Sequence, residues 1–252
     1  MGHAIERIAR DRGHEIVAVI DAGNVADMDG DAFASAEAAI EFTTPSTAPA
    51  NILKAASRGV PVVCGSTGWN DRRAEVESGV IAAGGSLLAS SNFSIGVNVF
   101  NVISRRLAAI MSHLPQYKPS MTEVHHIHKL DHPSGTAITL AEGIMAEDKG
   151  ITSWTDAGIV HADSPDMPSE ARAASEAMDN THASSLPILS LRQGEVPGIH
   201  TINWDSPVDT ITISHSAKSR DGFALGAVMA AEWLAGRKGI FTIDQMMEDL
   251  IK

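Results

Sequence analysis

The densest group of titratable side chains lies in residues 123–137, EVHHIHKLDHPSGTA. His125, His126 and His128 stand within four positions of one another, and Lys129 follows directly. A histidine can donate or accept a proton near neutral pH, and a lysine beside it adds a fixed positive charge for an anionic ligand. This spacing therefore predicts proton transfer to a negatively charged small molecule.

The residues that follow predict a place for that negative charge. Pro133 and Ser134 precede an apolar-periodic segment, so Ser134, Gly135 and Thr136 should form the N-terminus of a helix. Unpaired N–H groups and the helix dipole make such a terminus favourable for a carboxylate or phosphate. A proton donor, a cation and an anion site are thus expected within twelve residues.

Two other interpretations of this stretch stay open at this point. Ser134 is among the favoured N-cap residues and could serve the helix alone. His126, His128 and His132 could converge on zinc if they share one face of a strand. We disfavour zinc and predict no metal, because Lys129 would repel the ion and no Cys, Glu or Asp completes a familiar ligand spacing.

Composition excludes several classes of protein. The 252 residues are 44% hydrophobic and 20% charged, which is ordinary for a globular enzyme, and the formal net charge of −12 disfavours nucleic acid or an anionic membrane as partner. The single cysteine, Cys64, excludes an intrachain disulfide and fits a reducing compartment, so we predict the cytoplasm. No signal peptide and no run of 18 apolar residues is visible.

The first ninety residues alternate between strand and helix patterns. Strands are predicted at 15–21, 38–42, 60–65 and 86–90, and helices at 5–9, 47–59 and 71–83, with Gly13 and Gly59 placed as helix ends. This alternation predicts an α/β domain with a mostly parallel sheet covered on both faces.

The pattern changes after residue 95. We predict helices at 96–113, 134–149 and 165–180 and strands at 120–128, 186–192, 200–204 and 209–217, which suggest an open sheet in a second domain. If the strand persists to residue 128, His125 and Lys129 share one face and His126 and His128 the other. Two final helices, 222–236 and 242–252, are expected to return to the first domain.

Residues 123–137 resemble the signature of the dihydrodipicolinate reductase family, E-x-H-H-x-x-K-x-D-x-P-S-G-T-A. The resemblance continues in order through EFTTP (41–45), CGSTGW (64–69), SNFSIGVN (91–98), RQGEVPGIHT (192–201) and ISHSAKSRDGFALGA (213–227). It implies a Rossmann-like doubly wound parallel sheet in residues 1–95 plus 221–252. A smaller mixed α/β domain for substrate binding and oligomerisation, 96–220, would complete the protein.

The resemblance also implies an activity and an assembly. Family members reduce 4-hydroxy-tetrahydrodipicolinate, a dicarboxylate, to tetrahydrodipicolinate with NAD(P)H and loss of water, in the diaminopimelate route to lysine. A homotetramer joined through the sheet of the second domain is expected. A non-catalytic ligand-binding relative of the reductase is the alternative.

Individual positions carry over from the family motifs. His125 matches the proton donor and Lys129 the second catalytic residue, while His126, Gly135 and Thr136 match positions that hold the substrate carboxylates. The positions matched to cofactor binding are Gly2, Asp21, Gly65, Ser66, Thr67, Ser90, Ser91, Asn92 and Phe93.

The N-terminus departs from the family pattern. The chain begins MGHAIERIA, which matches only the tail of the expected G-x-G-x-x-G turn, with Gly2 as its last glycine. The first strand of the sheet and two glycines are missing from the match. We favour a start at an internal methionine of a longer reading frame; a truncated protein with impaired cofactor binding is the other interpretation.

Asp21 bears on the choice of cofactor. It ends a predicted strand about twenty residues beyond the glycine turn, where an acid accepts hydrogen bonds from the adenosine ribose of NAD. Ala22 follows it, and no basic residue stands there to receive a 2′-phosphate. We predict that NADH is preferred over NADPH; alternatively Asp21 only forms a turn.

Overall fold

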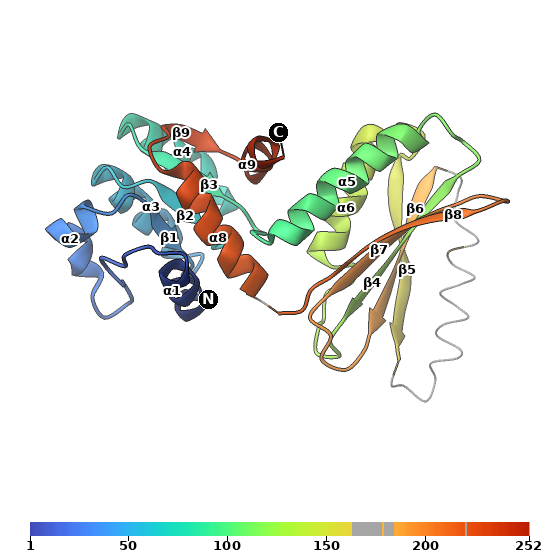
Figure 1. Ribbon diagram of the computed structural model, residues 1–252, viewed down its shortest axis with the longest axis horizontal. Coiled ribbons are helices and arrows are strands. Elements are labelled where there is room, and N and C mark those ends of the chain that lie inside the picture. Colours follow the sequence, from blue (N-terminus) through green and yellow to red (C-terminus); the bar gives the residue numbers. More distant parts are fainter. Residues whose placement is uncertain (163–177, 179–183, 220, 252) are drawn as a thin grey trace. The chain divides into compact units, whose positions relative to one another are not determined.

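The computed structural model describes residues 1–162, 178, 184–219 and 221–251 (Figure 1). The chain divides into two compact units, which we describe separately. Unit 1 comprises Met1–Asn98 and Asp221–Lys252, and unit 2 comprises Val99–Arg220. The predicted helix at 165–180 lies outside the described residues, apart from residue 178.

Unit 1 is built on a parallel four-stranded sheet. Its strands, in spatial order, are β1 (Ala39–Glu41), β2 (Val62–Cys64), β3 (Ser86–Ala89) and β9 (Gly239–Phe241). The longer helices are α1 (Gly2–Asp11), α3 (Ala48–Ser57), α4 (Arg73–Ala82), α8 (Asp221–Leu234) and α9 (Ile243–Leu250). Three short helices complete the unit: η1 (Val25–Asp29), α2 (Asp31–Ala34) and η2 (Asn70–Arg72).

The two faces of this sheet carry different cores. Val62 and Leu87 pack with α3 and α4, whereas their neighbours Val63 and Leu88 pack with α1, α8 and α9. Because successive strand residues point to opposite faces, continuous apolar strands such as these need helices on both sides. The predicted Rossmann-like α/β architecture is therefore confirmed in this unit.

The strand predicted at 15–21 is wrong. Residues 14–21 form no strand, and within the described residues β1 pairs only with β2. The alternation that motivated the prediction is real: Ala18 and Ile20 pack on the core, while Val17 and Val19 are 37% and 63% exposed. An extended segment becomes a strand only through ladder hydrogen bonds, and this one has no partner alongside.

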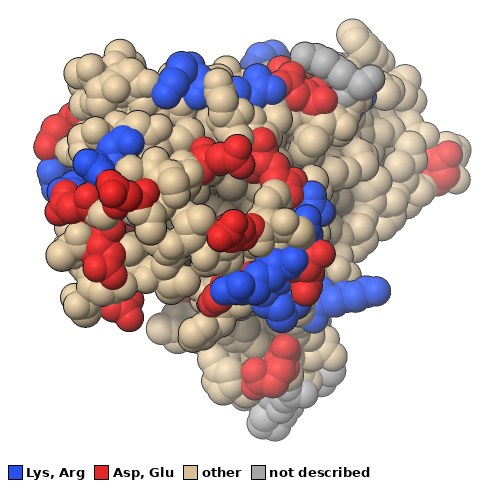
Figure 2. All heavy atoms as spheres, turned by 60° about the vertical axis from the view of Figure 1, so that its left-hand side comes forward, with Lys and Arg blue, Asp and Glu red and all other residues tan. Residues whose placement is uncertain are grey.

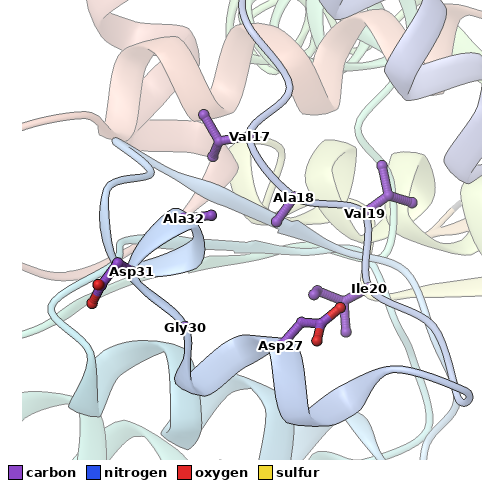
Figure 3. Close-up of a pocket in the computed structure, with 8 residues that line it drawn as sticks. All are labelled: Val17, Ala18, Val19, Ile20, Asp27, Gly30, Asp31 and Ala32. Carbon is purple, nitrogen blue, oxygen red and sulfur yellow. The ribbon is translucent and has the colours of Figure 1, made fainter.

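A shallow pocket of about 290 Å³ borders this segment (Figure 3). It is lined by Val17, Ala18, Val19, Ile20, Asp27, Gly30, Asp31 and Ala32, so its polar side chains are two carboxylates from η1 and the start of α2. None of the predicted site residues lines it. The predicted site residues therefore lie outside this pocket.

Unit 2 contains a mixed five-stranded sheet in the order β5-β6-β4-β7-β8. The strands are β4 (Lys118–His125), β5 (Ser153–His161), β6 (Ser185–Arg192), β7 (Ile199–Asp205) and β8 (Thr210–Ser216). The central strand β4 runs parallel to β6 and antiparallel to β7. Helices α5 (Ile95–Met111) and α6 (Gly135–Glu147) cover one face, where Trp204, Met121 and Leu140 share a core (Figure 1).

Three local predictions need correction, two in unit 2 and one, concerning β9, in unit 1. The strand expected at 120–128 ends at His125, and a turn follows in which the Lys129 N–H donates to the His126 carbonyl at 3.1 Å. Lys129 is therefore not on the strand face of His125. Strands β5 and β9 were not predicted, because β5 is largely polar and irregular and β9 has only three residues.

No helix in the described part of the chain is both long enough and apolar enough to cross a membrane.

Candidate active site

The carboxyl ends of β1, β2 and β3 gather several predicted cofactor residues at one edge of the parallel sheet. Gly65, Ser66 and Thr67 follow β2, and Ser90 to Phe93 follow β3. The loops are tied to the neighbouring strands: the Gly65 N–H donates to the Glu41 carbonyl at 2.9 Å, and the Ser90 N–H donates to the Cys64 carbonyl at 3.0 Å. Ligands of open α/β sheets bind beyond this edge.

Gly65 is required by a close approach. A Cβ at this position would lie 2.1 Å from Cζ of the Phe42 ring, far inside contact distance. The next residue is bonded to the segment that follows β1, because Ser66 Oγ accepts from the Thr43 N–H at 2.7 Å. Glycine therefore lets this loop lie against the Phe42 ring, which any larger residue would have to displace.

Cys64 is not a nucleophile at this edge. Its thiol is buried and donates to Glu41 Oε2 at 3.1 Å. Burial, together with the Glu41 charge, raises the pKa of the Cys64 thiol well above its usual value, so the sulfur stays protonated and unreactive.

The loop after β3 is held by its own side chains and by α8. Ser90 Oγ donates to the Asn92 carbonyl at 3.0 Å, and Asn92 Oδ1 accepts from the Ser94 N–H at 2.9 Å. Phe93 is buried, and Gly226 of α8 lies so close that a Cβ there would meet the Phe93 carbonyl oxygen at 1.6 Å. Ser91 at the loop tip is exposed.

The two remaining predicted cofactor residues lie at turns. Gly2 is the first residue of α1 and is exposed. Asp21 is also exposed, and its Oδ1 accepts from the Gly23 N–H at 2.7 Å while its own N–H donates to Asn24 Oδ1 at 2.7 Å. The turn-forming role considered for Asp21 is thus present, and it occupies one of the two carboxylate oxygens.

The predicted proton donor lies at the end of β4 in unit 2. His125 has an 11% exposed side chain, and its Nδ1 lies 2.6 Å from Oε2 of Glu123, two residues earlier on the same strand face. The His200 ring meets His125 edge-on at a centroid distance of 5.2 Å, because β7 places His200 opposite Glu123. His125 therefore lies in a packed, polar pocket.

Glu123 is fully buried but well bonded. Its Oε1 accepts from Ser190 Oγ at 2.7 Å and from Arg192 Nη2 at 3.1 Å. Burial opposes ionisation of this carboxyl, but hydrogen bonds from His125, Ser190 and Ser134 outweigh it and lower the pKa of Glu123. The carboxylate is consequently charged at neutral pH.

Lys129 lies in the turn after β4 and is held by two partners. Its Nζ contacts both carboxylate oxygens of Asp131, at 2.7 and 2.8 Å. Its main chain is fixed from the other side, because Arg192 Nε donates to the Lys129 carbonyl at 3.2 Å and Arg192 Nη2 to the Asp131 carbonyl at 2.8 Å.

The N-terminus of α6 is capped as predicted. Ser134 Oγ accepts from the Ala137 N–H at 3.2 Å, and the same oxygen lies 3.2 Å from His200 Nε2. Gly135 is exposed, with open space where a side chain would begin, and Thr136 is half-buried. The positive end of this helix, with Gly135 and Thr136 in its first turn, is thus linked through Ser134 and His200 to the His125 pocket.

The three histidines considered for zinc do not converge. His128 Nε2 lies 3.0 Å from Glu195, whereas His132 Nδ1 lies 2.9 Å from Asp156 on β5. Within the described ranges, the group whose ligand atoms lie within 4.8 Å of one another is Glu123, His125 and His200. Its carboxylate is already paired with a buried guanidinium, Arg192, which opposes a cation there.

The charged side chains do not form a basic patch on the face shown in Figure 2, where lysine and arginine are interspersed with aspartate and glutamate. At the surface of the chain, Arg7 pairs with Asp221 and Arg72 with Glu75, and all four side chains are exposed. A mixture of charges on this face, with a formal net charge of −12 for the chain, is not the basic surface that typically binds a phosphate backbone.

Sequence reasoning missed three residues of the pocket: Glu123, Arg192 and His200. For Glu123 a signal existed, since its spacing of two from His125 puts both on one face of a strand. The other two belong to the quoted stretch RQGEVPGIHT, but their position opposite β4 depends on strand pairings that the sequence does not reveal.

Comparison with known proteins agrees with this arrangement. Residues 1–93 match the family described as dihydrodipicolinate reductase, N-terminus, and residues 96–247 match dihydrodipicolinate reductase, C-terminus. The chain is 38% identical over 252 residues to the 4-hydroxy-tetrahydrodipicolinate reductase of Christiangramia forsetii, covering 100% of this chain and 95% of the relative. It is 35% identical over 221 residues to that of Archaeoglobus fulgidus, covering 84% and 76%.

A solved structure shares the fold. The dipicolinate-bound dihydrodipicolinate reductase from Paenisporosarcina sp. TG-14 superimposes with a TM-score of 0.69 over 96% of this chain and 92% of that chain. The sequence identity of 18% makes this a likeness of fold alone.

Proposed function

Because this chain belongs to the dihydrodipicolinate reductase family, we propose that it reduces 4-hydroxy-tetrahydrodipicolinate to tetrahydrodipicolinate with NAD(P)H and loss of water. The reaction belongs to the diaminopimelate route to lysine. The observation that carries this proposal is the pocket at the end of β4. There His125 contacts Glu123, and Arg192 bonds both to Glu123 and to the main chain of the turn that carries Lys129. A match that spans the whole chain argues against a non-catalytic relative.

Each residue of the pocket has a role in this reaction. His125 acts as the donor with both ring nitrogens protonated: the Nδ1 hydrogen stays directed to Glu123, the Nε2 proton is given to the substrate, and Nε2 then takes up a new proton for the next turnover. Lys129 supplies positive charge that orients the substrate and assists loss of hydroxide as water. His126 and the first N–H groups of α6, at Gly135 and Thr136, hold the carboxylates of the substrate.

The cofactor fits the loops at the carboxyl edge of the unit 1 sheet. Exposed Thr67 and Ser91 offer hydroxyl groups suited to ribose and carboxamide oxygens. Bound NAD(P)H supplies the hydride that reduces the unsaturated carbon of the substrate. The protein supplies position and charge.

NADH should be the better cofactor. Asp21 is exposed, its second carboxylate oxygen lies outside the Gly23 turn, and Ala22 brings no positive charge for a 2′-phosphate. We propose a preference of roughly tenfold in kcat/KM, equivalent to about 1–2 kcal/mol. Equal or better use of NADPH would contradict this role for Asp21.

A homotetramer joined through the unit 2 sheet is the proposed assembly. Strand β8 lies at the edge of this sheet, and its Ile211 is 38% exposed. Unpaired edges and exposed apolar side chains favour association with another sheet. Light scattering at micromolar concentration should give the mass of four chains; a stable monomer would refute the proposal. With its only cysteine buried, we also propose a cytoplasmic location.

The function is tested by following NADH oxidation with freshly generated 4-hydroxy-tetrahydrodipicolinate. Turnover by the unmodified chain, and its loss in His125→Ala, would support the proposal. Binding of the dicarboxylate without any turnover would overturn it in favour of a ligand-binding protein.

A further inference from the structure

We propose that Glu123 and Arg192 form a positioning pair that sets the ring of His125 and the turn that carries Lys129. The pair is fully buried, and its members lie 3.1 Å apart, between Glu123 Oε1 and Arg192 Nη2. The proposal rests on the proposed function, because it takes His125 and Lys129 as the catalytic residues. Neither member of the pair is assigned contact with the substrate.

Glu123 fixes which nitrogen of His125 carries the proton. An ionised carboxylate can only accept hydrogen bonds, so the ring nitrogen facing it must hold a hydrogen. That nitrogen is Nδ1, which lies 2.6 Å from Oε2; both atoms are buried, and within the described residues neither has a hydrogen-bond partner elsewhere to compete with this close contact. The Nε2 atom is therefore the one left for proton transfer.

A glycine keeps that second nitrogen accessible. Gly198 lies beside the ring, where a Cβ would stand 3.1 Å from His125 Nε2 and 3.4 Å from Cδ2. Its φ of +154° is also outside the range that side-chain-bearing residues favour. The Nδ1 edge of the His125 ring thus faces the Glu123 carboxylate, and the Nε2 edge faces Gly198, which has no side chain to cover it.

Arg192 fixes the second catalytic residue through its main chain. Its guanidinium donates to Glu123 Oε1 and to the carbonyls of Lys129, Asp131 and Leu191. Planar guanidinium geometry lets one side chain reach all of these acceptors, which a lysine ammonium could not do. The same cation thus holds both the carboxylate behind His125 and the turn bearing Lys129.

Strand pairing explains why these two residues meet. His125 lies opposite Arg192 in the parallel β4–β6 pair, and Glu123 lies opposite Ser190 in the same ladder. The resulting ion pair has no solvent contact, and replacing such pairs by apolar side chains is often neutral or stabilising. Stability alone is therefore a weak reason for a charged pair at this position.

The first test measures the proton on His125 in the unmodified full-length chain. Nitrogen-15 NMR of histidine-labelled protein distinguishes Nδ1–H from Nε2–H in a neutral ring, and loss of the signal in His125→Ala assigns it. We expect the Nδ1–H form. Finding the Nε2–H form, which dominates in free histidine, would overturn the role of Glu123, and this readout does not require reductase activity.

The second test is a double-mutant cycle in turnover. Glu123→Gln should lower kcat on the order of 10²-fold, within the range attributed to general acid catalysis, but by less than about threefold when His125 is already alanine. A purely structural role predicts equal losses in both backgrounds and would overturn the proposal. Glu195→Gln, which removes a carboxylate from exposed His128, is the matched control and should retain full turnover.

The third test concerns Arg192. Arg192→Lys retains the charge beside Glu123 but not the reach to the carbonyls of the turn, so kcat should fall about tenfold or more while the His125 tautomer is unchanged. An unaltered kcat would show that Arg192 does not position the Lys129 turn. Absence of turnover in the unmodified chain would instead refute the proposed function, and the NMR result would still decide the role of Glu123.

Discussion

Acidification should destabilise unit 2 through His200. Burial, followed by the neighbouring charge of His125, lowers the pKa of His200 from 6.5 to about 4. The unfolded chain takes up a proton as the pH falls through 6.5, whereas the folded chain does so only near pH 4. Stability conferred by the neutral ring is therefore complete above pH 6.5 and is lost as the pH falls from 6.5 to 4.

The size of the effect follows from the shift. A difference of about 2.5 pKa units corresponds to about 3 kcal/mol when the loss is complete, and to about 2 kcal/mol at pH 5. Glu123 does not contribute in this interval, because its lowered pKa makes it titrate below the usual carboxyl range. Between pH 7 and pH 5, the change in the free energy of unfolding thus comes mainly from histidines.

Urea unfolding at pH 7 and pH 5 measures this loss when it is followed by tryptophan fluorescence, to which buried Trp204 of unit 2 contributes. The matched variant is His200→Gln, whose amide can still donate to Ser134 but does not titrate. The unmodified protein should lose about 2 kcal/mol more than the variant between the two pH values, or roughly 1 M in midpoint for an m-value of about 2 kcal/mol/M. His215, whose pKa is also lowered by burial, is present in both proteins, so its contribution to the loss of stability cancels in the comparison.

Equal losses in the unmodified protein and His200→Gln would refute this reasoning. That result would mean that water or a rearranged partner solvates the protonated ring within the folded unit.

Three further predictions concern activity and the cofactor edge. His125→Ala or Lys129→Ala should lower kcat by about 10²–10⁴-fold with unchanged circular dichroism, and near-full turnover in both would contradict their assignment. Ala22→Arg should improve kcat/KM for NADPH by about tenfold, measured against NADH at low ionic strength, because it adds the missing positive charge beside Asp21; no change would exclude that position from the 2′-phosphate site. Gly65→Ala should weaken NADH binding about tenfold or more in fluorescence titrations, since its Cβ would displace Phe42, and unaltered affinity would remove this loop from the cofactor site.

Apolar periodicity predicted most of the fold because the helices and strands concerned bury one side or both. The helix at 96–113 was observed as Ile95–Met111, and the strand at 186–192 as Ser185–Arg192. The same rule failed at 15–21, where the side chains alternate correctly but the backbone has no strand to bond to. The pattern of apolar residues indicates which side chains are buried. A sheet also requires a neighbouring strand, and the pattern does not identify that strand.

The site was predictable where its residues are close in the sequence. Ser134 was identified as a helix N-cap from its place before an apolar segment, and the structure has that bond. The turn at 126–129 was not predicted. It depends on a hydrogen bond from the Ile127 N–H to the Gly194 carbonyl, which is 67 residues away in the sequence. Arg192 and His200 enter the pocket for the same reason, through pairings of β4 with later strands.

The central place of β4 also sets the order in which this protein can become active during synthesis. The neighbours of β4 in the sheet are β6, ending at Arg192, and β7, ending at Asp205. When the ribosome has made residues 123–137, both edges of β4 are still without partners, and contacts between distant segments form slowly. A nascent chain therefore carries its whole signature motif for about 55 residues of further synthesis before Glu123 has its arginine, and chaperones have that interval in which to bind the open strand.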